Sequence, residues 1–250
     1  MIDYLTVIYK NYDLLYLQLD NFKKLFPNKD YRLIVVDNTP DIEKKKIERK
    51  DEIDIIVEME SLPNTFDGIS HGGAIDASLP YCESDIVCIF DSDFFFLDEH
   101  LDSYIKEKFE LGYTAVGTEW DDGLGTRPWV KKFPERFENI PCAFGSFYSL
   151  DLAKSESWIV TQQEVHQNQS NGFIEVGWRI RKRILENKLK TLSWKLSPIS
   201  DNEKFSGYGN CFFVNEYDKL MGVHYVAGSH VRWNSNTYLE VQNLLDSEYD

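Results

Sequence analysis

Residues 86 to 93 read Ile86-Val87-Cys88-Ile89-Phe90-Asp91-Ser92-Asp93, an apolar run that ends abruptly in two acidic residues. Such a run is typical of a β-strand that is buried on both faces, as in a parallel sheet. The two carboxylates that follow fall on a turn, where their oxygens can share one hard divalent cation. A solvated acidic turn could have the same sequence. The position directly after a buried strand is what favours a metal site.

Three more strand-like runs precede this stretch and alternate with helical patterns. The expected strands cover residues 5–9, 31–36 and 53–57, the expected helices cover 12–25 and 68–79, and the charged segment 42–50 suggests a short surface helix. Regular alternation of strand and helix predicts an α/β domain with helices packed on its sheet. Ligands of such sheets bind beyond the carboxyl ends of the strands. Tyr9, Asp37 and Asp91 follow expected strands, so we expect all three at one edge.

The second half of the chain has less regular patterns. Helices are expected at 101–111, 178–187 and within 235–250, and strands at 114–117, 143–150, 211–214 and 223–226. Residues 119–141 are rich in Gly, Pro and Trp and predict a long loop, a type of segment that is often functional. No repeat or linker divides the chain, which therefore reads as a single domain of residues 1–250.

The composition excludes several classes of protein. The formal net charge of -15 argues against nucleic acid or an anionic membrane as a partner, since both attract Lys and Arg. Four cysteines without a CxxC pair disfavour a zinc site and fit a reducing compartment. The sequence has no signal-peptide pattern and no apolar run near the roughly 20 residues that span a bilayer. We therefore expect a cytoplasmic protein without a transmembrane segment.

Four groups of residues carry a resemblance to a known family, namely Leu5-Thr6-Val7-Ile8-Tyr9, Val35-Val36-Asp37-Asn38, Asn64 with Gly68, and Phe90-Asp91-Ser92-Asp93. In these the chain resembles the GT-A fold glycosyltransferases, most closely the inverting family-two class. The resemblance covers about the first 100 residues well and the rest by scattered motifs. It implies a Rossmann-like mixed sheet flanked by helices, with residues 1–100 binding a nucleotide sugar and residues 101–250 binding the acceptor.

The resemblance also implies an activity and a cofactor. The chain would transfer a sugar from a nucleotide-diphosphate sugar, with a UDP-sugar favoured, to a carbohydrate or other hydroxyl acceptor. Mn²⁺ or Mg²⁺ would hold the donor diphosphate. Asp91 would approach the ribose or the metal, Asp93 would coordinate the metal, and His224 would be a further metal ligand. Without the resemblance, His224 reads as an ordinary histidine on a strand.

Further donor contacts are expected around these ligands. Asp37 would hydrogen-bond the base, although it is also a good residue to start a turn before Pro40. The other expected donor-binding residues are Tyr9, Asn64, Gly68, His71, Ser92 and Arg232. Asn64 and Gly68 could equally serve as capping and close-packing residues at a helix start. Arg232 could supply a cation for the diphosphate.

The acceptor side depends on two regions. Glu175 would be the general base that takes the proton of the acceptor hydroxyl, although an acid near a helix start is also favoured by the helix dipole. The family often has a second acid next to it, and here Val176 takes that place. Trp120, Asp121 and Asp122 in the long loop could contact an acceptor sugar or form a surface excursion.

Two other functions remain open at this point. A sugar-1-phosphate nucleotidyltransferase would use a related sheet and a metal, but it needs a glycine-rich loop after the first strand, where this chain has Tyr9-Lys10-Asn11. A non-catalytic carbohydrate-binding module would need neither metal nor nucleotide. The acidic pair Asp91 and Asp93 argues against the second alternative.

Overall fold

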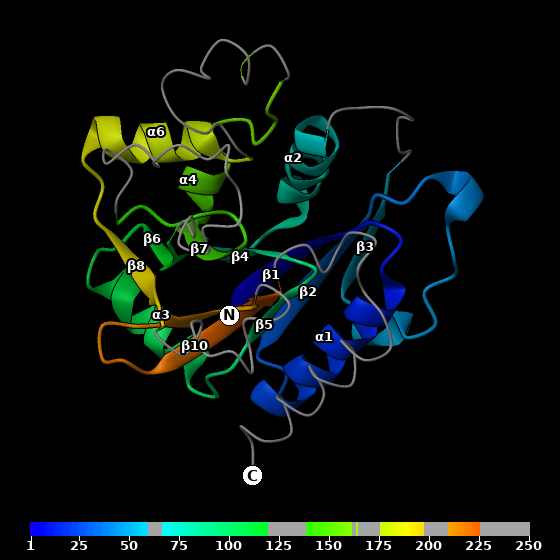
Figure 1. Ribbon diagram of the computed structural model, residues 1–250, viewed down its shortest axis with the longest axis horizontal. Helices are drawn as coiled ribbons and strands as arrows, with labels where there is room; N and C mark the ends of the chain where they lie inside the picture. Colours follow the sequence, from blue (N-terminus) through cyan, green and yellow to red (C-terminus); the bar gives the residue numbers. More distant parts are fainter. Residues whose placement is uncertain (60–66, 120–138, 162–163, 165–175, 198–209, 226–250) are drawn as a thin grey trace.

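A computed structural model describes residues 1–59, 67–119, 139–161, 164, 176–197 and 210–225. Within them, ten strands form one mixed sheet in the order β3-β2-β1-β4-β7-β6-β8-β9-β10-β5 (Figure 1). The strands are β1 (Ile2–Ile8), β2 (Tyr31–Asp37), β3 (Ile55–Glu58), β4 (Ile86–Asp91), β5 (Phe94–Phe96), β6 (Ala115–Thr118), β7 (Gly145–Ser149), β8 (Thr191–Leu196), β9 (Asn210–Val214) and β10 (Leu220–Tyr225). The helices are α1 (Tyr12–Leu25), α2 (Asp67–Ser78), α3 (Leu101–Glu110), α4 (Leu150–Ala153) and α6 (Trp178–Asn187).

The first four strands of this order are parallel, and β1 lies between β2 and β4. The chain runs from β1 outward to β2 and β3 and then returns to the other side of β1 as β4. The strand order therefore reverses between β1 and β4, which is where open α/β sheets bind their ligands. Ile8 pairs with Asp37 and Val7 with Asp91, so the carboxyl ends of the three strands meet at one edge. This confirms the predicted common edge.

The second half of the sheet is mainly antiparallel. Strand β7 pairs antiparallel with both β4 and β6, and β8 returns parallel to β6. Strands β9, β10 and β5 follow in antiparallel order. Only Ser92 and Asp93 separate β4 from β5 in the chain. Strand β5, the last in the strand order, therefore lies next to the end of β4. The sheet is thus mixed, as predicted.

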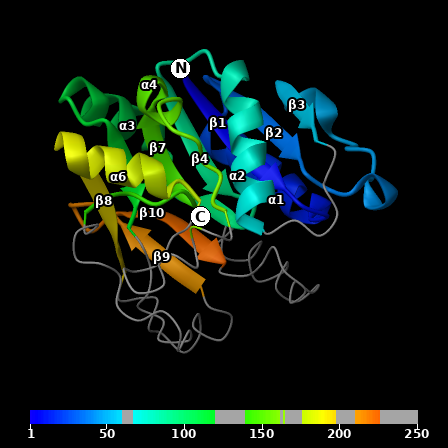
Figure 2. The ribbon, with the colours of Figure 1, turned by 90° about the horizontal axis from the view of Figure 1, so that it is seen from above.

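Helices cover both faces of the sheet because its central strands are apolar on both faces. Alternate residues of β4 enter two separate cores: Cys88 and Phe90 pack in the cluster that includes residues of α1 and α3, whereas Val87 and Ile89 pack in the cluster that includes residues of α2, α4 and α6. Figure 2 shows α2, α4 and α6 on one face of the sheet. This two-sided burial explains the unbroken apolar run of β4.

Within the described residues, one predicted helix was wrong, and two strands and one α-helix were missed. Segment 42–50 is not a helix, since the structure has only short 3-10 turns at Asp41–Glu43 and Lys50–Glu52. The segment has two apolar residues, Ile42 and Ile47, and their spacing of five would put them on different sides of a helix; Ile47 is buried in the core, whereas Ile42 is 95% exposed. Strands β5 and β8 and helix α4 were not predicted. The terminal helix expected within 235–250 and most of the loop 119–141 lie outside the described residues.

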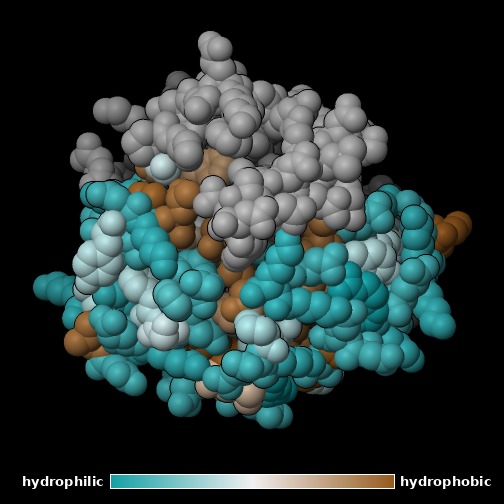
Figure 3. Space-filling view, turned by 90° about the horizontal axis from the view of Figure 1, so that it is seen from below, coloured by the Kyte–Doolittle hydropathy of each residue, from teal (hydrophilic) through white to brown (hydrophobic). Residues whose placement is uncertain are grey.

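The surface agrees with the charge-rich composition. On the face shown in Figure 3, hydrophilic residues cover most of the described surface, and apolar residues emerge in smaller groups between them. No helix in the described part of the chain combines the length and the apolar character needed to cross a membrane.

Candidate metal and nucleotide site

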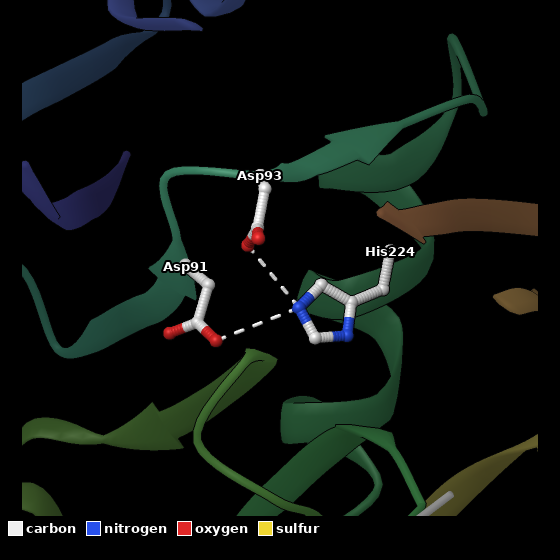
Figure 4. A group of neighbouring side chains, drawn as sticks. All are labelled: Asp91, Asp93 and His224. Atoms are coloured by element: carbon white, nitrogen blue, oxygen red, sulfur yellow. Dashed lines mark hydrogen bonds and ion pairs between the residues drawn. The ribbon is translucent and has the colours of Figure 1, made fainter. Parts of the chain in front are cut away.

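Three side chains from distant parts of the sequence converge at the end of β4. Asp91 is the last residue of β4, Asp93 follows two residues later, and His224 lies on β10 (Figure 4). The Nε2 atom of His224 lies 3.2 Å from Oδ1 of Asp93 and 3.5 Å from Oδ2 of Asp91. One potential ligand atom from each residue lies within 4.8 Å of the others. The predicted set of three metal ligands is therefore brought together.

The pairing of β5 with β10 explains how His224 reaches this site. His224 lies opposite Phe94, the residue that directly follows Asp93. The ring of Phe94 fits against Gly145 of β7 and Gly222 of β10, where an added Cβ would come within 2.6 Å and 2.4 Å of ring atoms. Phe144 stacks on the imidazole of His224, with ring centroids 4.8 Å apart and planes at 9°. Close packing thus fixes the ring of His224 toward the two carboxylates.

The electrostatics of the cluster favour a cation. Burial opposes protonation of His224, but the charges and hydrogen bonds of Asp93 and Asp91 outweigh it and raise the pKa of the imidazole to about 10. Burial would likewise raise the pKa of Asp91, yet the hydrogen bond to His224 and the nearby His71 hold it below its usual value. Both shifts reflect a site that stabilises positive charge between two carboxylates.

The donor set also fits Mn²⁺ or Mg²⁺ chemically. Carboxylate oxygens suit both ions, and an imidazole nitrogen is a good ligand for Mn²⁺. Adjacent ligands of an octahedral ion at about 2.1 Å are roughly 3 Å apart, close to the observed 3.2 and 3.5 Å. The side chain of Asp93 is 3% exposed and that of Asp91 29%. The site is therefore closed on the side of Asp93 and open to a ligand on the side of Asp91.

His71 approaches the same carboxylate from α2. Its Nε2 atom lies 3.8 Å from Oδ1 of Asp91, whereas His224 faces Oδ2. The side chain of His71 is 34% exposed. The predicted donor-binding residue His71 thus lies beside the candidate metal ligands and remains accessible.

The ends of β1 and β2 form the neighbouring part of the edge. Asp37 is buried, and its carboxylate accepts hydrogen bonds from the hydroxyl of Tyr12 at 2.9 Å and from the backbone N–H of Thr39 at 3.0 Å. The backbone N–H of Lys10 donates to Oγ1 of Thr39 at 2.8 Å, which ties the two strand ends together. Tyr9 is 43% exposed. Asp37 therefore orders this edge, and Tyr9 presents an accessible ring on it.

The remaining predicted site residues divide into two groups. Ser92 is buried in the turn between the two aspartates, and Gly68 is the second residue of α2. The others lie outside the described residues, namely Asn64, Trp120, Asp121, Asp122, Glu175 and Arg232.

Two neighbours of the site were not anticipated from the sequence. Phe144 stacks on His224, and Gln18 of α1 donates a hydrogen bond to the backbone carbonyl of Asp91 at 3.1 Å. Phe144 is one of 16 phenylalanines and carries no distinguishing pattern. Gln18 does carry a signal, since it is a polar residue between Leu17 and Leu19 on a helix that is otherwise buried there.

No protein-family model and no curated protein matches this chain. Among solved structures it is similar to a mannosyltransferase from Pyrobaculum calidifontis in complex with GDP-Man and Mn²⁺ (16% identity, TM-score 0.45, 62% of this chain and 46% of that chain). It is similar to S. aureus TarS (15% identity, TM-score 0.46, 68% of this chain and 33% of that chain). It is also similar to galactosyltransferase LgtC in complex with donor and acceptor sugar analogues (11% identity, TM-score 0.46, 73% of this chain and 70% of that chain).

Two of these three proteins are glycosyltransferases by name, the class that the sequence resembles. The chain spans less than half the length of the first two. At these identities and TM-scores, the likeness assigns neither a substrate nor an activity to this chain. Its function has to be inferred from its own site.

Proposed function

We propose that this chain transfers a sugar from a nucleotide-diphosphate sugar to a hydroxyl acceptor. The supporting observation is the cluster of Asp91, Asp93 and His224, which lies at the carboxyl edge of the sheet where the strand order reverses between β1 and β4. That edge is the usual ligand site of open α/β sheets. A chain with a net charge of -15 needs a local cation to bind an anionic diphosphate, and this cluster supplies ligands for one.

The proposed cofactor is Mn²⁺ or Mg²⁺ on Asp91, Asp93 and His224. When bound, such an ion neutralises the negative charge that develops on the departing nucleoside diphosphate. Tyr9 and Asp37 would contact the base, with a UDP-sugar as the favoured donor, and Ser92 would line the donor site. Asn64, Gly68 and His71 would also contact the donor, and Arg232 would add a positive charge beside the diphosphate.

The proposed acceptor chemistry is a single displacement with inversion. Glu175 would remove the proton from the acceptor hydroxyl, and Trp120, Asp121 and Asp122 would bind the acceptor. Residues 1–100 would then form the donor half and residues 101–250 the acceptor half. This division is not strict, because His224 belongs to the second half and lies beside Asp93 of the first.

A nucleotide-binding panel tests the donor site first. UDP, GDP, dTDP and CMP are each added with Mn²⁺ and again with EDTA, and the thermal midpoint is recorded. A ligand at about 100 times its dissociation constant adds roughly 2.7 kcal/mol of stability, which is several degrees for a chain of this size. We expect one nucleotide to raise the midpoint with Mn²⁺ and to lose the effect in EDTA. Equal midpoints with and without every nucleotide would contradict the proposal.

Matched variants locate the metal within the protein. His224→Ala should abolish the Mn²⁺-dependent shift, whereas His100→Ala should preserve it, because the side chain of His100 is 71% exposed and pairs only with Glu99 among the contacts in the described chain. Asp93→Asn should behave like His224→Ala. A Mn²⁺-dependent shift that survives in both site variants would place the metal elsewhere.

Transfer assays then separate the catalytic alternatives. Glu175→Gln should lower the transfer rate by about 10² or more, since general bases contribute 10²–10⁴-fold, and should leave the nucleotide shift intact. Transfer by this variant near the wild-type rate would refute the role of Glu175. Release of pyrophosphate from a nucleoside triphosphate and a sugar phosphate would identify a nucleotidyltransferase instead.

A further inference from the structure

The backbone of the turn that carries the two aspartates accepts hydrogen bonds from one buried side chain, that of Gln18. Nε2 of Gln18 donates to the carbonyl oxygen of Asp91 at 3.1 Å and to that of Phe94 at 3.3 Å. These carbonyls stand at the two ends of the turn that contains Ser92 and Asp93. Gln18 belongs to α1 and is 1% exposed. A single amide group with two N–H bonds thus joins both ends of the turn.

A second amide of α1 continues the same pattern. Nδ2 of Asn21 donates to the carbonyl oxygen of Phe96 at 3.0 Å, and Asn21 is also 1% exposed. Strand β5 is the last strand of the sheet and pairs with β10 along one edge. The carbonyls of Phe94 and Phe96, two residues apart, point to the same edge. Gln18 and Asn21, three residues apart on one helix face, bond to that edge in place of a further strand.

The amides of Gln18 and Asn21 bond to different parts of the backbone. Asn21 reaches only β5, beyond the aspartates, whereas Gln18 bonds to Asp91 itself and to the residue after Asp93. The amide oxygens of Gln18 and Asn21 are both buried and have no hydrogen-bond partner among the described residues, so this feature does not distinguish the two side chains. A buried polar atom without a partner costs free energy. Both amides therefore carry this cost, and Gln18 differs from Asn21 in that its N–H bonds reach both ends of the turn that carries the aspartates.

We propose that Gln18 is a positioning residue of the metal site. Its amide fixes the two ends of the turn, so that the carboxylates of Asp91 and Asp93 face His224 before a cation binds. The residue touches neither substrate nor cation and acts through the backbone of the ligand residues. This inference rests on the proposed function, because it assumes that the three side chains hold a divalent cation.

The test compares Gln18→Met with Asn21→Leu. Each substitution replaces a buried amide with an apolar side chain of similar size, and each removes hydrogen bonds from α1 to the sheet edge. Mn²⁺ binding is titrated on the purified full chain by the electron paramagnetic resonance signal of free Mn²⁺. Groups that orient metal ligands typically contribute 10–100-fold in affinity. Because Gln18 holds the backbone and not the ligating oxygens, we expect a loss of about 10-fold in Gln18→Met.

The control separates positioning from general destabilisation. We expect Asn21→Leu to lower the thermal midpoint about as much as Gln18→Met does, while its Mn²⁺ affinity stays within about twofold of the wild type. The spectrum of bound Mn²⁺ should broaden in Gln18→Met only, because the ligands then hold several arrangements. Equal Mn²⁺ affinity in Gln18→Met and the wild type would overturn the inference, as would an equal loss in both variants.

Mn²⁺ binding by the wild-type chain distinguishes the proposed metal site from the proposed role of Gln18. If the wild-type chain binds no Mn²⁺, the metal site itself is refuted, and the role of Gln18 with it. If the wild type binds Mn²⁺ and Gln18→Met binds it equally well, only the role of Gln18 is refuted. If Gln18→Met does not fold, the side-chain amide protons of Gln18 are followed in the wild type by ¹⁵N NMR. Mg²⁺ is added in place of Mn²⁺, because Mn²⁺ is paramagnetic and would broaden these signals. Slow solvent exchange that slows further with Mg²⁺ supports the role, and exchange unaffected by Mg²⁺ overturns it.

Discussion

Replacing Gly145 with alanine should destabilise the protein, because the ring of Phe94 has glycine on both of its edges. An added Cβ at position 145 would lie 2.6 Å from Cε2 and Cζ of Phe94, and a Cβ at Gly222 would lie 2.4 Å from Cζ and 2.7 Å from Cε1. The ring cannot move away from one strand without pressing on the other. Overpacking of this kind typically costs about 1–3 kcal/mol, and each kcal/mol corresponds to roughly 2–4 °C in a chain of this size.

Gly73→Ala is the matched control for this experiment. A Cβ at Gly73 would meet only the side chain of Ile159 at 4.0 Å, which is an ordinary contact. Gly73 lies inside α2, where alanine is favoured over glycine by about 0.5–1 kcal/mol. Urea unfolding should therefore shift to lower midpoints in Gly145→Ala and to higher midpoints in Gly73→Ala. Mn²⁺ affinity should fall only in Gly145→Ala, since Phe94 adjoins Asp93. A wild-type urea midpoint for Gly145→Ala would refute the tight packing of Phe94.

Three further predictions follow from the charges and hydrogen bonds. Burial opposes protonation of His224, but Asp93 and Asp91 outweigh it and raise the pKa of the imidazole to about 10, so a binding cation has to displace a proton. The logarithm of the apparent Mn²⁺ affinity should therefore rise by about one for each pH unit between about 6.5 and 8.5. Titration calorimetry in buffers of different ionisation enthalpy should detect about one released proton. An affinity that is flat with pH would contradict this. The hydrogen bond from Arg49 lowers the pKa of Glu52 to about 2. Because this is below the unfolded value, the stabilisation is present above about pH 4.5 and is lost as the pH falls through about 2. Urea unfolding of Glu52→Gln should therefore give a free energy of unfolding up to about 1 kcal/mol below that of the wild type at pH 7, and this difference should shrink as the pH falls through about 2. Tyr12→Phe removes the hydroxyl that donates to Asp37 and accepts from the backbone N–H of Lys45. This should lower the free energy of unfolding by about 1 kcal/mol and leave nucleotide affinity unchanged, whereas Asp37→Asn should weaken nucleotide binding measured by calorimetry. The same nucleotide affinity in Asp37→Asn and the wild type would remove Asp37 from the donor site.

The elements that the sequence predicted well are those with a local pattern. Helix α1 was expected at residues 12–25 and covers Tyr12–Leu25, because its leucines recur at helical spacing and are buried. Helix α6 likewise matches the expected range 178–187. Strand β4 and its acidic turn were found because a two-sided strand needs an uninterrupted apolar run. The candidate metal ligands Asp91 and Asp93 follow from that strand alone.

The elements that the sequence missed depend on contacts between distant residues. Strand β5 has only three residues, all phenylalanine, and its partner β10 lies more than 120 residues away in the chain. No local pattern marks such a pair. His224 was expected from a family resemblance, whereas the reason for its position, the register that sets it opposite Phe94, exists only in the folded sheet. The stacking of Phe144 and the hydrogen bonds of Gln18 depend on the same packing.

The pairing of β10 with β5 also bears on the order in which parts of this protein fold. Asp93 and His224 are separated by 131 residues, and their contact depends on the pairing of β10 with β5 and β9. Contacts that close so long a stretch of chain carry a large entropic cost and form late in folding. Strands β1 to β4, with their helices, can reach a packed state before His224 arrives. We therefore expect the cation site to be the last part of the protein completed during folding and the first part lost during unfolding.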